Sequence, residues 1–452
     1  MMRYIPNTPE QQQEMLHQLG LSSLDDLFSD IPKEALLQKP LDLPESLSES
    51  ELLHHMESLA SRNENLREHV CFLGAGAYDH FVPLVIDHIL SREEFFTSYT
   101  PYQPEMSQGT LQAIFEYQSM ICELTGMEVS NASMYDGATA LAEAAVMACT
   151  VQKRRKILVS PSVDPQYRKV LATYGINRNM EIVELPLEGG QLQESTLEAA
   201  LDEETAAVVL QSPNFFGSLE KIPPLAEAAH ENGALCIVST DLLALALTEA
   251  PGNQGADLVT GNGQSAGNGL LFGGPHFGFF AATQKLMRKM PGRIAGETVD
   301  KKGRRGYVLT LQAREQHIRR EKATSNICSN HNLNIIAAAV YFSLMGPQGL
   351  REAAEQCQKK ALYTRKKLLE TGKFSPLFEA HTPFFREFPL KSSEAVERCN
   401  QRLRKHRILG GYDLSRDYPE LDQGWLVAVT EKRTLQEIDR FVKIAGGEDH
   451  ES

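Results

Sequence analysis

Asp241 stands at a point in the sequence where a carboxylate can serve a ligand. It follows the apolar run at residues 234–238, which predicts a buried strand. Open α/β sheets bind ligands at the carboxyl ends of their strands, and a carboxylate there can pair with a protonated ring nitrogen. Asp241 could equally cap a short helix over residues 242–247. The residue types alone leave both roles open.

A long stretch around Asp241 lacks basic residues, with no lysine or arginine at residues 222–284. In enzymes that use pyridoxal phosphate (PLP), an aspartate holds the pyridine nitrogen, and a lysine about twenty residues later forms the Schiff base. Here the aspartate is present and the lysine is absent. The pattern therefore indicates a PLP-enzyme scaffold without its covalent anchor.

The segment at residues 133–139 predicts the start of a helix that could bind a phosphate. Gly137 permits close approach of a ligand to the backbone, the helix start offers free N–H groups, and Thr139 adds a hydroxyl. An ordinary N-cap by Asp136 is the alternative.

Two further segments could face a ligand. Residues 99–105 (Tyr-Thr-Pro-Tyr-Gln-Pro-Glu, here the aromatic loop) combine rings with prolines that stiffen the chain. This loop predicts a wall for a small ligand or partner, or else packing against an N-terminal arm. Residues 272–274 (Phe-Gly-Gly, here the glycine turn) could offer N–H groups to an anion, or simply form a turn before a strand. His276 is best interpreted as a turn residue.

A basic cluster between residues 288 and 320, which includes Arg293 and Arg314, is typical of a solvated face, or of an arginine-rich surface between subunits.

The composition limits the classes of function. The 452 residues carry 45 Lys+Arg and 59 Asp+Glu, a net charge of −14, which argues against a general nucleic-acid binder. The sequence shows neither a signal-peptide pattern nor an apolar run long enough to cross a membrane. Seven dispersed cysteines are typical of reduced thiols in the cytoplasm.

The order of elements predicts an α/β protein with a mostly parallel sheet covered on both faces. We expect strands at residues 157–160, 182–184, 206–210, 235–239, 258–260 and 278–283. Helices are expected at residues 109–126, 138–150, 165–174, 196–201, 224–232 and 349–370. We expect a helical N-terminal arm (residues 1–83), a large domain (84–345) and a small α/β C-terminal domain (346–452).

Together these motifs resemble one family, the glycine decarboxylase P-protein of the glycine cleavage system, and specifically subunit 1 of its split bacterial form. The matching segments are residues 99–105 with Ser107-Gln108-Gly109, residues 131–140, residues 273–279, residues 312–320 and residues 326–328. The resemblance covers nearly the whole chain. It implies the aspartate-aminotransferase-like fold of PLP-dependent transferases.

The resemblance also implies a function and partners. The enzyme, glycine dehydrogenase (aminomethyl-transferring, decarboxylating), removes CO2 from glycine and passes the aminomethyl group to lipoyl H-protein. In split forms, two kinds of subunit assemble as an α2β2 tetramer, and subunit 2 carries PLP on its lysine. In this chain the equivalent position falls at Gln264 or Ser265, so we expect no covalently bound PLP and no activity from the chain alone.

The expected site residues fall into two groups. Contributions to the partner's active site are expected from Tyr99, Tyr102, Gln103, Glu105, Phe272, Gly273 and Gly274. A vestigial cofactor pocket is expected at Gly137, Ala138, Thr139 and Asp241, and no metal is expected. Two alternatives stay open: a purely structural subunit with a decayed pocket, or a self-sufficient PLP aminotransferase or lyase that uses Lys285.

Overall fold

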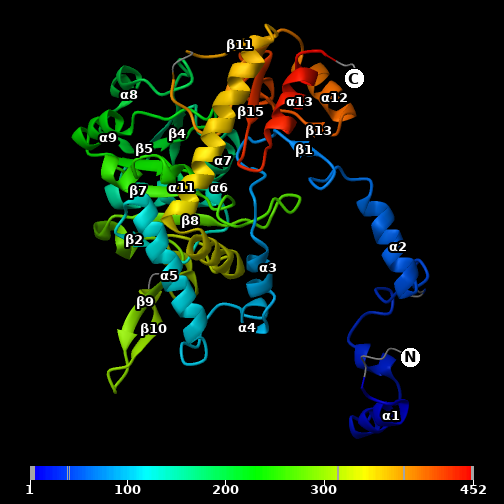
Figure 1. Ribbon diagram of the computed structural model, residues 1–452. Helices are drawn as coiled ribbons and strands as arrows, with labels where there is room; N and C mark the ends of the chain where they lie inside the picture. Colours follow the sequence, from blue (N-terminus) through cyan, green and yellow to red (C-terminus); the bar gives the residue numbers. More distant parts are fainter. Residues whose placement is uncertain (1–5, 38, 40, 313–314, 380–381, 449–452) are drawn as a thin grey trace. The chain divides into compact units, whose positions relative to one another are not determined.

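The computed structural model describes residues 6–448 except 38, 40, 313–314 and 380–381. Contacts divide the chain into two units, residues 1–64 and residues 65–452 (Figure 1). The domain boundaries expected near residues 83 and 345 remain a prediction. Residues 313–314, part of one motif of the family resemblance, lie outside the described residues, as does Arg314 of the basic cluster.

The first unit contains α1 (Pro9–Gln18), a 3₁₀ turn η1 (Leu24–Phe28) and α2 (Glu49–Ala60). Thr8 and Ser48 begin the two helices with capping boxes. Among the described residues of this unit Leu16 is buried, whereas Leu19, Leu37, Leu41, Leu43 and Leu53 are more than half exposed. This unit therefore presents apolar surface with almost no core of its own.

The second unit is built on a seven-stranded sheet. Its order is β2 (Val129–Ser130), β8 (Gly278–Ala282), β7 (Leu258–Asn262), β6 (Leu235–Ser239), β5 (Thr205–Gln211), β3 (Lys156–Val159) and β4 (Glu181–Glu184). The strands from β7 to β4 pair in parallel, while β8 pairs antiparallel with both of its neighbours. The expected mostly parallel sheet is confirmed.

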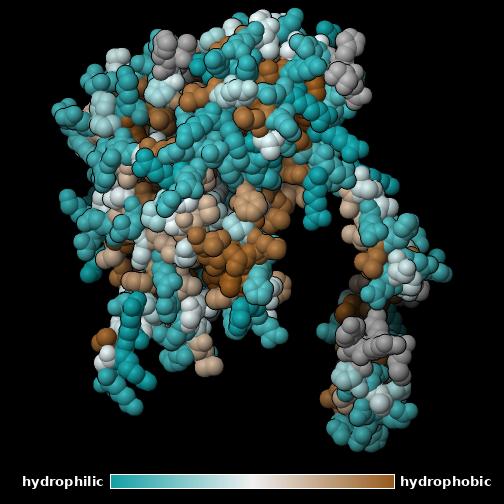
Figure 2. All heavy atoms as spheres, in the orientation of Figure 1, coloured by the Kyte–Doolittle hydropathy of each residue, from teal (hydrophilic) through white to brown (hydrophobic). Residues whose placement is uncertain are grey.

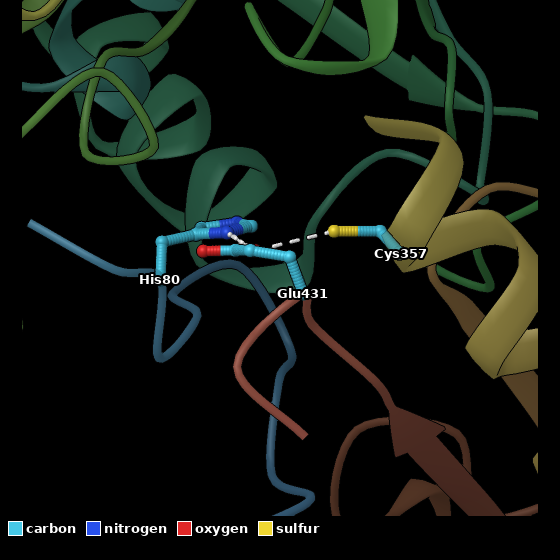
Figure 3. Close-up of side chains that lie close together, drawn as sticks. All are labelled: His80, Cys357 and Glu431. Atoms are coloured by element: carbon cyan, nitrogen blue, oxygen red, sulfur yellow. Dashed lines mark hydrogen bonds and ion pairs between the residues drawn. The ribbon is translucent and has the colours of Figure 1, made fainter. Parts of the chain in front are cut away.

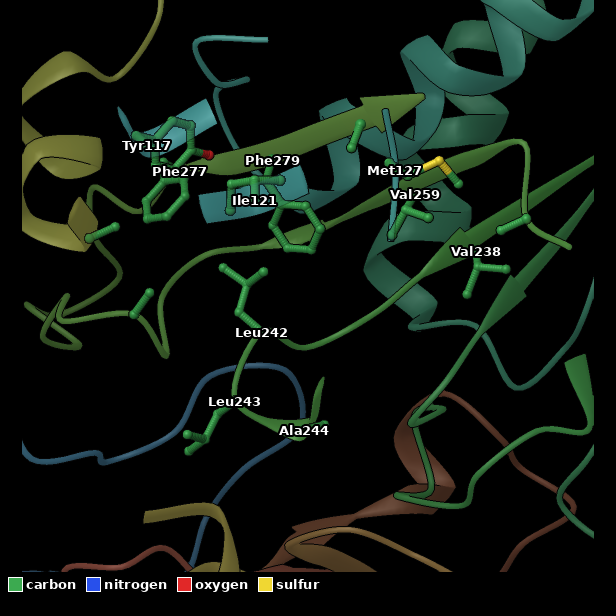
Figure 4. Close-up of a cluster of buried hydrophobic side chains, with 14 of the residues drawn as sticks. Tyr117, Ile121, Met127, Val238, Leu242, Leu243, Ala244, Val259, Phe277 and Phe279 are labelled. Atoms are coloured by element: carbon green, nitrogen blue, oxygen red, sulfur yellow. The ribbon is translucent and has the colours of Figure 1, made fainter. Parts of the chain in front are cut away.

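Helices cover both faces of the sheet. One face packs against α5 (Gln108–Thr125), α9 (Ile222–Glu231) and the first half of α11 (Asn332–Glu370), and Figure 4 shows side chains of this layer. The other face packs against α6 (Gly137–Gln152) and α7 (Pro165–Arg178). Successive strand residues such as Val208 and Val209 belong to opposite layers, because side chains alternate along a strand.

A smaller sheet follows toward the C-terminus, in the order β11 (Phe374–Pro376), β12 (Glu387–Ser392), β15 (Gly424–Ala428) and β14 (Tyr412–Asp413). Helices α12 (Val396–Lys405) and α13 (Leu435–Ala445) pack against it around the fully buried Trp425. The early strand β1 (Val70–Cys71) pairs with β13 (Ile408–Leu409), so the segment that enters the second unit lies against its C-terminal layer.

The remaining helices and strands are short. They are α3 (Leu84–Leu90), α4 (Glu93–Phe96), α8 (Glu194–Ala200), α10 (Gln316–Arg319), β9 (Ile294–Val299) and β10 (Arg305–Thr310). The 3₁₀ turns are η2 (Ala244–Ala246), η3 (Pro251–Gln254), η4 (Gln284–Lys289), η6 (Arg320–Lys322) and η7 (Leu414–Arg416). Strands β9 and β10 form an antiparallel hairpin.

Helix α11 is long and apolar enough to meet a length-and-composition criterion for a membrane span. Core helices meet the same criterion, and Ile335, Ala338 and Tyr341 on α11 are buried in the core of this unit. Gly346 interrupts the helix with non-helical φ 59° and ψ −179°.

Candidate functional site

Asp241 lies where the sequence places it, just beyond the carboxyl end of β6. Its Oδ1 accepts hydrogen bonds from the backbone N–H groups of Leu243 (3.0 Å) and Ala244 (3.1 Å). Its Oδ2 lies 3.1 Å from the guanidinium of Arg386. The carboxylate thus begins the η2 turn and also pairs with a cation, so both of its expected kinds of partner are present within the chain itself.

Arg386 is a buried cation that fills the space next to Asp241. It is 3% exposed, and the centre of its guanidinium lies 3.4 Å from the centre of the Tyr78 ring. Burial opposes its charge, but the neighbouring acidic groups, Asp241 foremost, together outweigh this effect and raise the pKa of Arg386. Burial would raise the pKa of Asp241, but Arg386, His80 and the Ala244 N–H together more than reverse that effect, so the pKa is lowered. The pair is therefore ionised.

His80 is a second hydrogen-bond partner of Arg386. Because an arginine N–H can only donate, His80 Nε2 accepts from Arg386 Nη1 at 2.7 Å. Nδ1 then donates to Glu431 Oε2 at 2.7 Å, and the Cys357 thiol lies 3.3 Å from the same oxygen (Figure 3). Burial would raise the pKa of Glu431, but His80 and the Phe81 N–H, which hydrogen-bond to its carboxylate, lower it.

His80, Cys357 and Glu431 each offer one possible metal-ligand atom, and these atoms lie within 4.8 Å of one another. However, the three groups satisfy one another, burial raises the pKa of the Cys357 thiol, and Arg386 adds a positive charge beside them. The geometry therefore favours a hydrogen-bonded relay over a cation site.

Gln264 and Ser265, the two residues at which the sequence suggests that the lysine is missing, both carry neutral side chains. Gln264 donates to the backbone carbonyls of Tyr78 and Asn268, both at 2.9 Å, and accepts from the Tyr78 N–H at 3.0 Å. Ser265 is 3% exposed, and its hydroxyl has no hydrogen-bond partner among the described residues. Lys285, the alternative anchor, is exposed on η4.

The start of α6 is the place where the sequence suggests a phosphate. Gly137, Ala138 and Thr139 form its first turn, and Asp136 Oδ1 caps it by accepting from the Thr139 N–H at 2.8 Å. A Cβ at Gly137 would lie only 2.1 Å from the Tyr167 hydroxyl. The close approach that glycine permits is therefore used by a tyrosine of the same chain.

These contacts leave a small cavity lined by Asp241, Gln264 and Ser265, together with Tyr78, Tyr167, Arg386 and Glu387. Its volume is about 40 Å³, enough for a few waters. Pockets for small ligands measure roughly 300–1,000 Å³. PLP does not fit the residues present here. Asp241 pairs with Arg386, Tyr167 closes the start of α6, and Gln264 is hydrogen-bonded to the surrounding backbone.

The aromatic loop lies elsewhere: none of its residues is among the described residues that line this cavity. Tyr99 (73%) and Tyr102 (53%) are exposed, as are Gln103 and Glu105. Buried Arg293 holds the loop from below, donating to the Tyr102 hydroxyl at 2.8 Å and to Thr100 Oγ1 at 3.3 Å. Its Nε also lies 3.7 Å from Glu315.

Arg293 corrects one expectation from the sequence. It belongs to the basic cluster interpreted as a solvated or inter-subunit face, but it is only 2% exposed. Arg293 fixes the aromatic loop through its hydrogen bonds to Thr100 and Tyr102. The spacing of the basic residues in the sequence does not indicate this role.

The glycine turn is also exposed and has an unusual backbone. Leu271 (φ 44°) and Phe272 (φ 54°) adopt left-handed conformations that non-glycine residues rarely take, and Gly273 and Gly274 follow with φ 113° and 117°. Phe272 is 81% exposed. Below the turn, the His276 carbonyl accepts from His331, and Asn334 donates to the Pro275 carbonyl at 2.9 Å. The local role expected for His276 agrees with this geometry.

Four residues that line the cavity were not predicted from the sequence: Tyr78, Tyr167, Arg386 and Glu387. Arg386 and Glu387 stand between Phe385 and Phe388, and two adjacent charges inside an aromatic run are a sign of buried ions. Tyr78 and Tyr167 carry no comparable signal.

Known proteins with similar sequences agree on one family. Residues 2–445 match the sequence model of the family described as "Glycine cleavage system P-protein". A protein of Carboxydothermus hydrogenoformans, named "Probable glycine dehydrogenase (decarboxylating) subunit 1", is 53% identical over 447 residues, or 99% of this chain and 100% of that protein.

Known structures agree with the sequences. A crystal structure of "glycine decarboxylase (P-protein) of the glycine cleavage system, in inhibitor-bound form" matches with a TM-score of 0.91 at 45% identity, covering 98% of this chain and 99% of that one. A sphingosine-1-phosphate lyase of Burkholderia pseudomallei shares the fold, with a TM-score of 0.65 at 16% identity over 91% of this chain and 92% of that one. The fold is the α/β fold of PLP-dependent transferases, and the chain belongs to the glycine cleavage system P-protein family.

Proposed function

We propose that this chain is the lysine-free subunit of a heteromeric glycine decarboxylase. The enzyme removes CO2 from glycine and passes the aminomethyl group to the lipoyl arm of H-protein. This chain pairs in the cytoplasm with a second, lysine-bearing subunit as an α2β2 tetramer, and PLP is bound covalently to that partner. The full-length similarity to a protein named subunit 1 supports this assignment.

One observation carries the proposal: Gln264 and Ser265, one of which stands at the expected lysine position, line a cavity that is too small for PLP. A PLP-fold subunit of this kind serves a PLP reaction only beside a subunit that holds the cofactor. Apolar surface on the first unit, and between α5 and α3 on the second (Figure 2), is typical of chains that assemble.

In the assembly, the aromatic loop and the glycine turn complete the partner's active site. Tyr99 and Tyr102 wall the pocket with rigid rings, while Gln103 and Glu105 supply polar groups. Phe272 and the N–H groups of Gly273 and Gly274 border it from the other segment. Glycine offers few groups to hold, so these residues act by positioning the substrate and excluding water.

The replacement Tyr102→Ala tests this role. We expect exchange of label between bicarbonate and the glycine carboxyl group to fall at least ~10-fold in the reconstituted tetramer, equivalent to about 1.4 kcal/mol. The replacement removes a ring that is 53% exposed, together with its contact to Arg293. The measurement is the exchange rate alongside the elution volume of the complex.

Two controls separate the effect of losing the Tyr102 ring from the effects of losing its hydroxyl and of removing any exposed apolar side chain. Tyr102→Phe keeps the ring but removes the hydroxyl that accepts from Arg293, so its loss should be smaller. Ile176→Ala removes a comparably exposed apolar side chain (78%) from α7 and should leave exchange unchanged. Full activity of the Tyr102→Ala tetramer would instead make this chain a scaffold only.

The isolated chain is expected to form no specific adduct when it is incubated with PLP and reduced with borohydride. Among the described residues that line the cavity there is no lysine, and Lys285 is exposed on η4. Mass spectrometry of the reduced chain provides the measurement. Stoichiometric labelling of Lys285 would favour a self-sufficient PLP enzyme.

A further inference from the structure

Arg386 is a buried cation beside Asp241. We propose that Arg386 is a built-in substitute for the charged ring nitrogen of PLP: its guanidinium pairs with Asp241 and fills the ring's place, so that the pocket excludes a pyridoxal ring even when a lysine is restored. This inference concerns the chain's own pocket and does not depend on the partner's activity.

The surroundings of Arg386 match those that a flat, positively charged ring would need. The carboxylate of Asp241 lies 3.1 Å from one edge of the guanidinium, as it would from a protonated nitrogen. The face of the guanidinium lies against the Tyr78 ring, with 3.4 Å between their centres. The planar guanidinium thus stacks on the Tyr78 ring and pairs with the Asp241 carboxylate at the same time. Arginine suits such a place because its flat cation can make both contacts.

The backbone around Arg386 is shaped to hold it in this place. Arg386 adopts φ 59°, a left-handed conformation that persists in a non-glycine residue only where its surroundings enforce it. A Cβ at Gly217 would lie 1.8 Å from the Glu387 carbonyl oxygen, so glycine is needed there for the neighbouring segment to pack closely. Glu387 is itself anchored by the Tyr78 hydroxyl at 2.7 Å and the Ala75 N–H at 2.6 Å.

Removing Arg386 would leave Asp241 as a buried carboxylate without its cation, in a larger cavity. Such a site favours any small planar cation that fits. The lysine position alone therefore does not decide whether the pocket accepts a cofactor ring. Arg386 is a second obstacle to binding of the cofactor ring, and it comes from the C-terminal layer.

A labelling experiment tests the first half of the proposal. Gln264→Lys and Ser265→Lys are each made with and without Arg386→Ala, and co-expressed with the partner subunit. The probe is pyridoxal, which lacks a phosphate, so the helix start closed by Tyr167 plays no part. After borohydride reduction, peptide mapping separates adducts on residues 259–285 of this chain from those on the partner.

The single lysine variants should carry at least about tenfold less adduct on these residues than the corresponding double variants. Equal labelling with and without Arg386, whether high or absent, would overturn the proposal.

A second measurement covers the case in which the double variants do not fold. Arg386→Ala alone, as the full chain with its partner, is melted in guanidinium chloride or in sodium chloride at equal, non-denaturing concentration. Guanidinium should raise the melting temperature of this variant relative to sodium, because it refills the site by mass action. The wild type and Arg351→Ala, which removes an exposed arginine from α11, should show no such rise. The same response to both salts in Arg386→Ala would contradict the proposal.

Discussion

Replacing Asp79 with alanine is expected to lower the free energy of unfolding by about 3–5 kcal/mol, the range for removing one side of a buried ion pair. Asp79 is 7% exposed, and its carboxylate lies 2.5 Å from Lys432 Nζ and 2.9 Å from the Arg433 guanidinium. Arg433 is itself 5% exposed, so its charge would lose this partner inside the protein. Urea unfolding followed by the fluorescence of Trp425, the single tryptophan, measures the effect.

A surface ion pair gives the matched control. Arg351→Ala removes an exposed partner of Glu355 on α11 and should cost less than about 1 kcal/mol. An equally small cost for Asp79→Ala would mean that the pair around Asp79 holds little of the fold. The prediction bears on the pocket as well, because the same segment brings Tyr78 and His80 to Arg386.

The central sheet could be predicted because its strands are short apolar runs between turn signals. Strand β6 has the bounds that the sequence predicts, and the other predicted strands differ by at most two residues at either end. The hairpin β9–β10 was missed, since charged residues such as Glu297 and Arg305 interrupt its apolar pattern. Local pattern therefore overlooks strands that charged residues interrupt, even where residues such as Ile294 and Tyr307 are buried.

Helix α11 is longer than the sequence predicts. We expect a helix only over residues 349–370. Gly346 does interrupt the helix, but a helical half precedes it from Asn332 and buries Ile335 and Ala338. Tertiary packing, and not the local sequence, decides that the chain is helical on both sides of Gly346.

The candidate pocket could be predicted only in part. Asp241 and the missing lysine lie on one stretch of chain, so spacing alone points to them. Arg386 comes from the C-terminal layer and Tyr78 from the segment before α3, and no spacing rule joins them to Asp241. The sequence therefore predicts which cofactor contacts are present or lost, while the fold decides what has replaced them.

The stability of this chain is also expected to fall as the pH rises from about 5 to 8, because buried Glu387 folds in its protonated form. Burial raises its pKa from 4.5 to about 7, although the Ala75 N–H and the Tyr78 hydroxyl oppose this effect. A raised pKa means that the contribution of Glu387 to stability is complete below pH 4.5 and is lost as the pH passes through 7. At about 1.4 kcal/mol per pKa unit, the loss amounts to about 3 kcal/mol.

Glu387→Gln isolates this contribution, because glutamine is neutral throughout and the Tyr78 hydroxyl can accept from its amide. Urea unfolding followed by Trp425 suits the test, since Glu387 on β12 is paired with Ala428 on β15, the strand that carries Trp425. Between pH 5 and 8 the wild type should lose about 3 kcal/mol more than the variant. Glu123→Gln, an exposed change on α5, should keep the wild-type dependence. Identical pH profiles for wild type and Glu387→Gln would show that Glu387 is ionised in the folded chain, and that Arg386 then has a second carboxylate beside it.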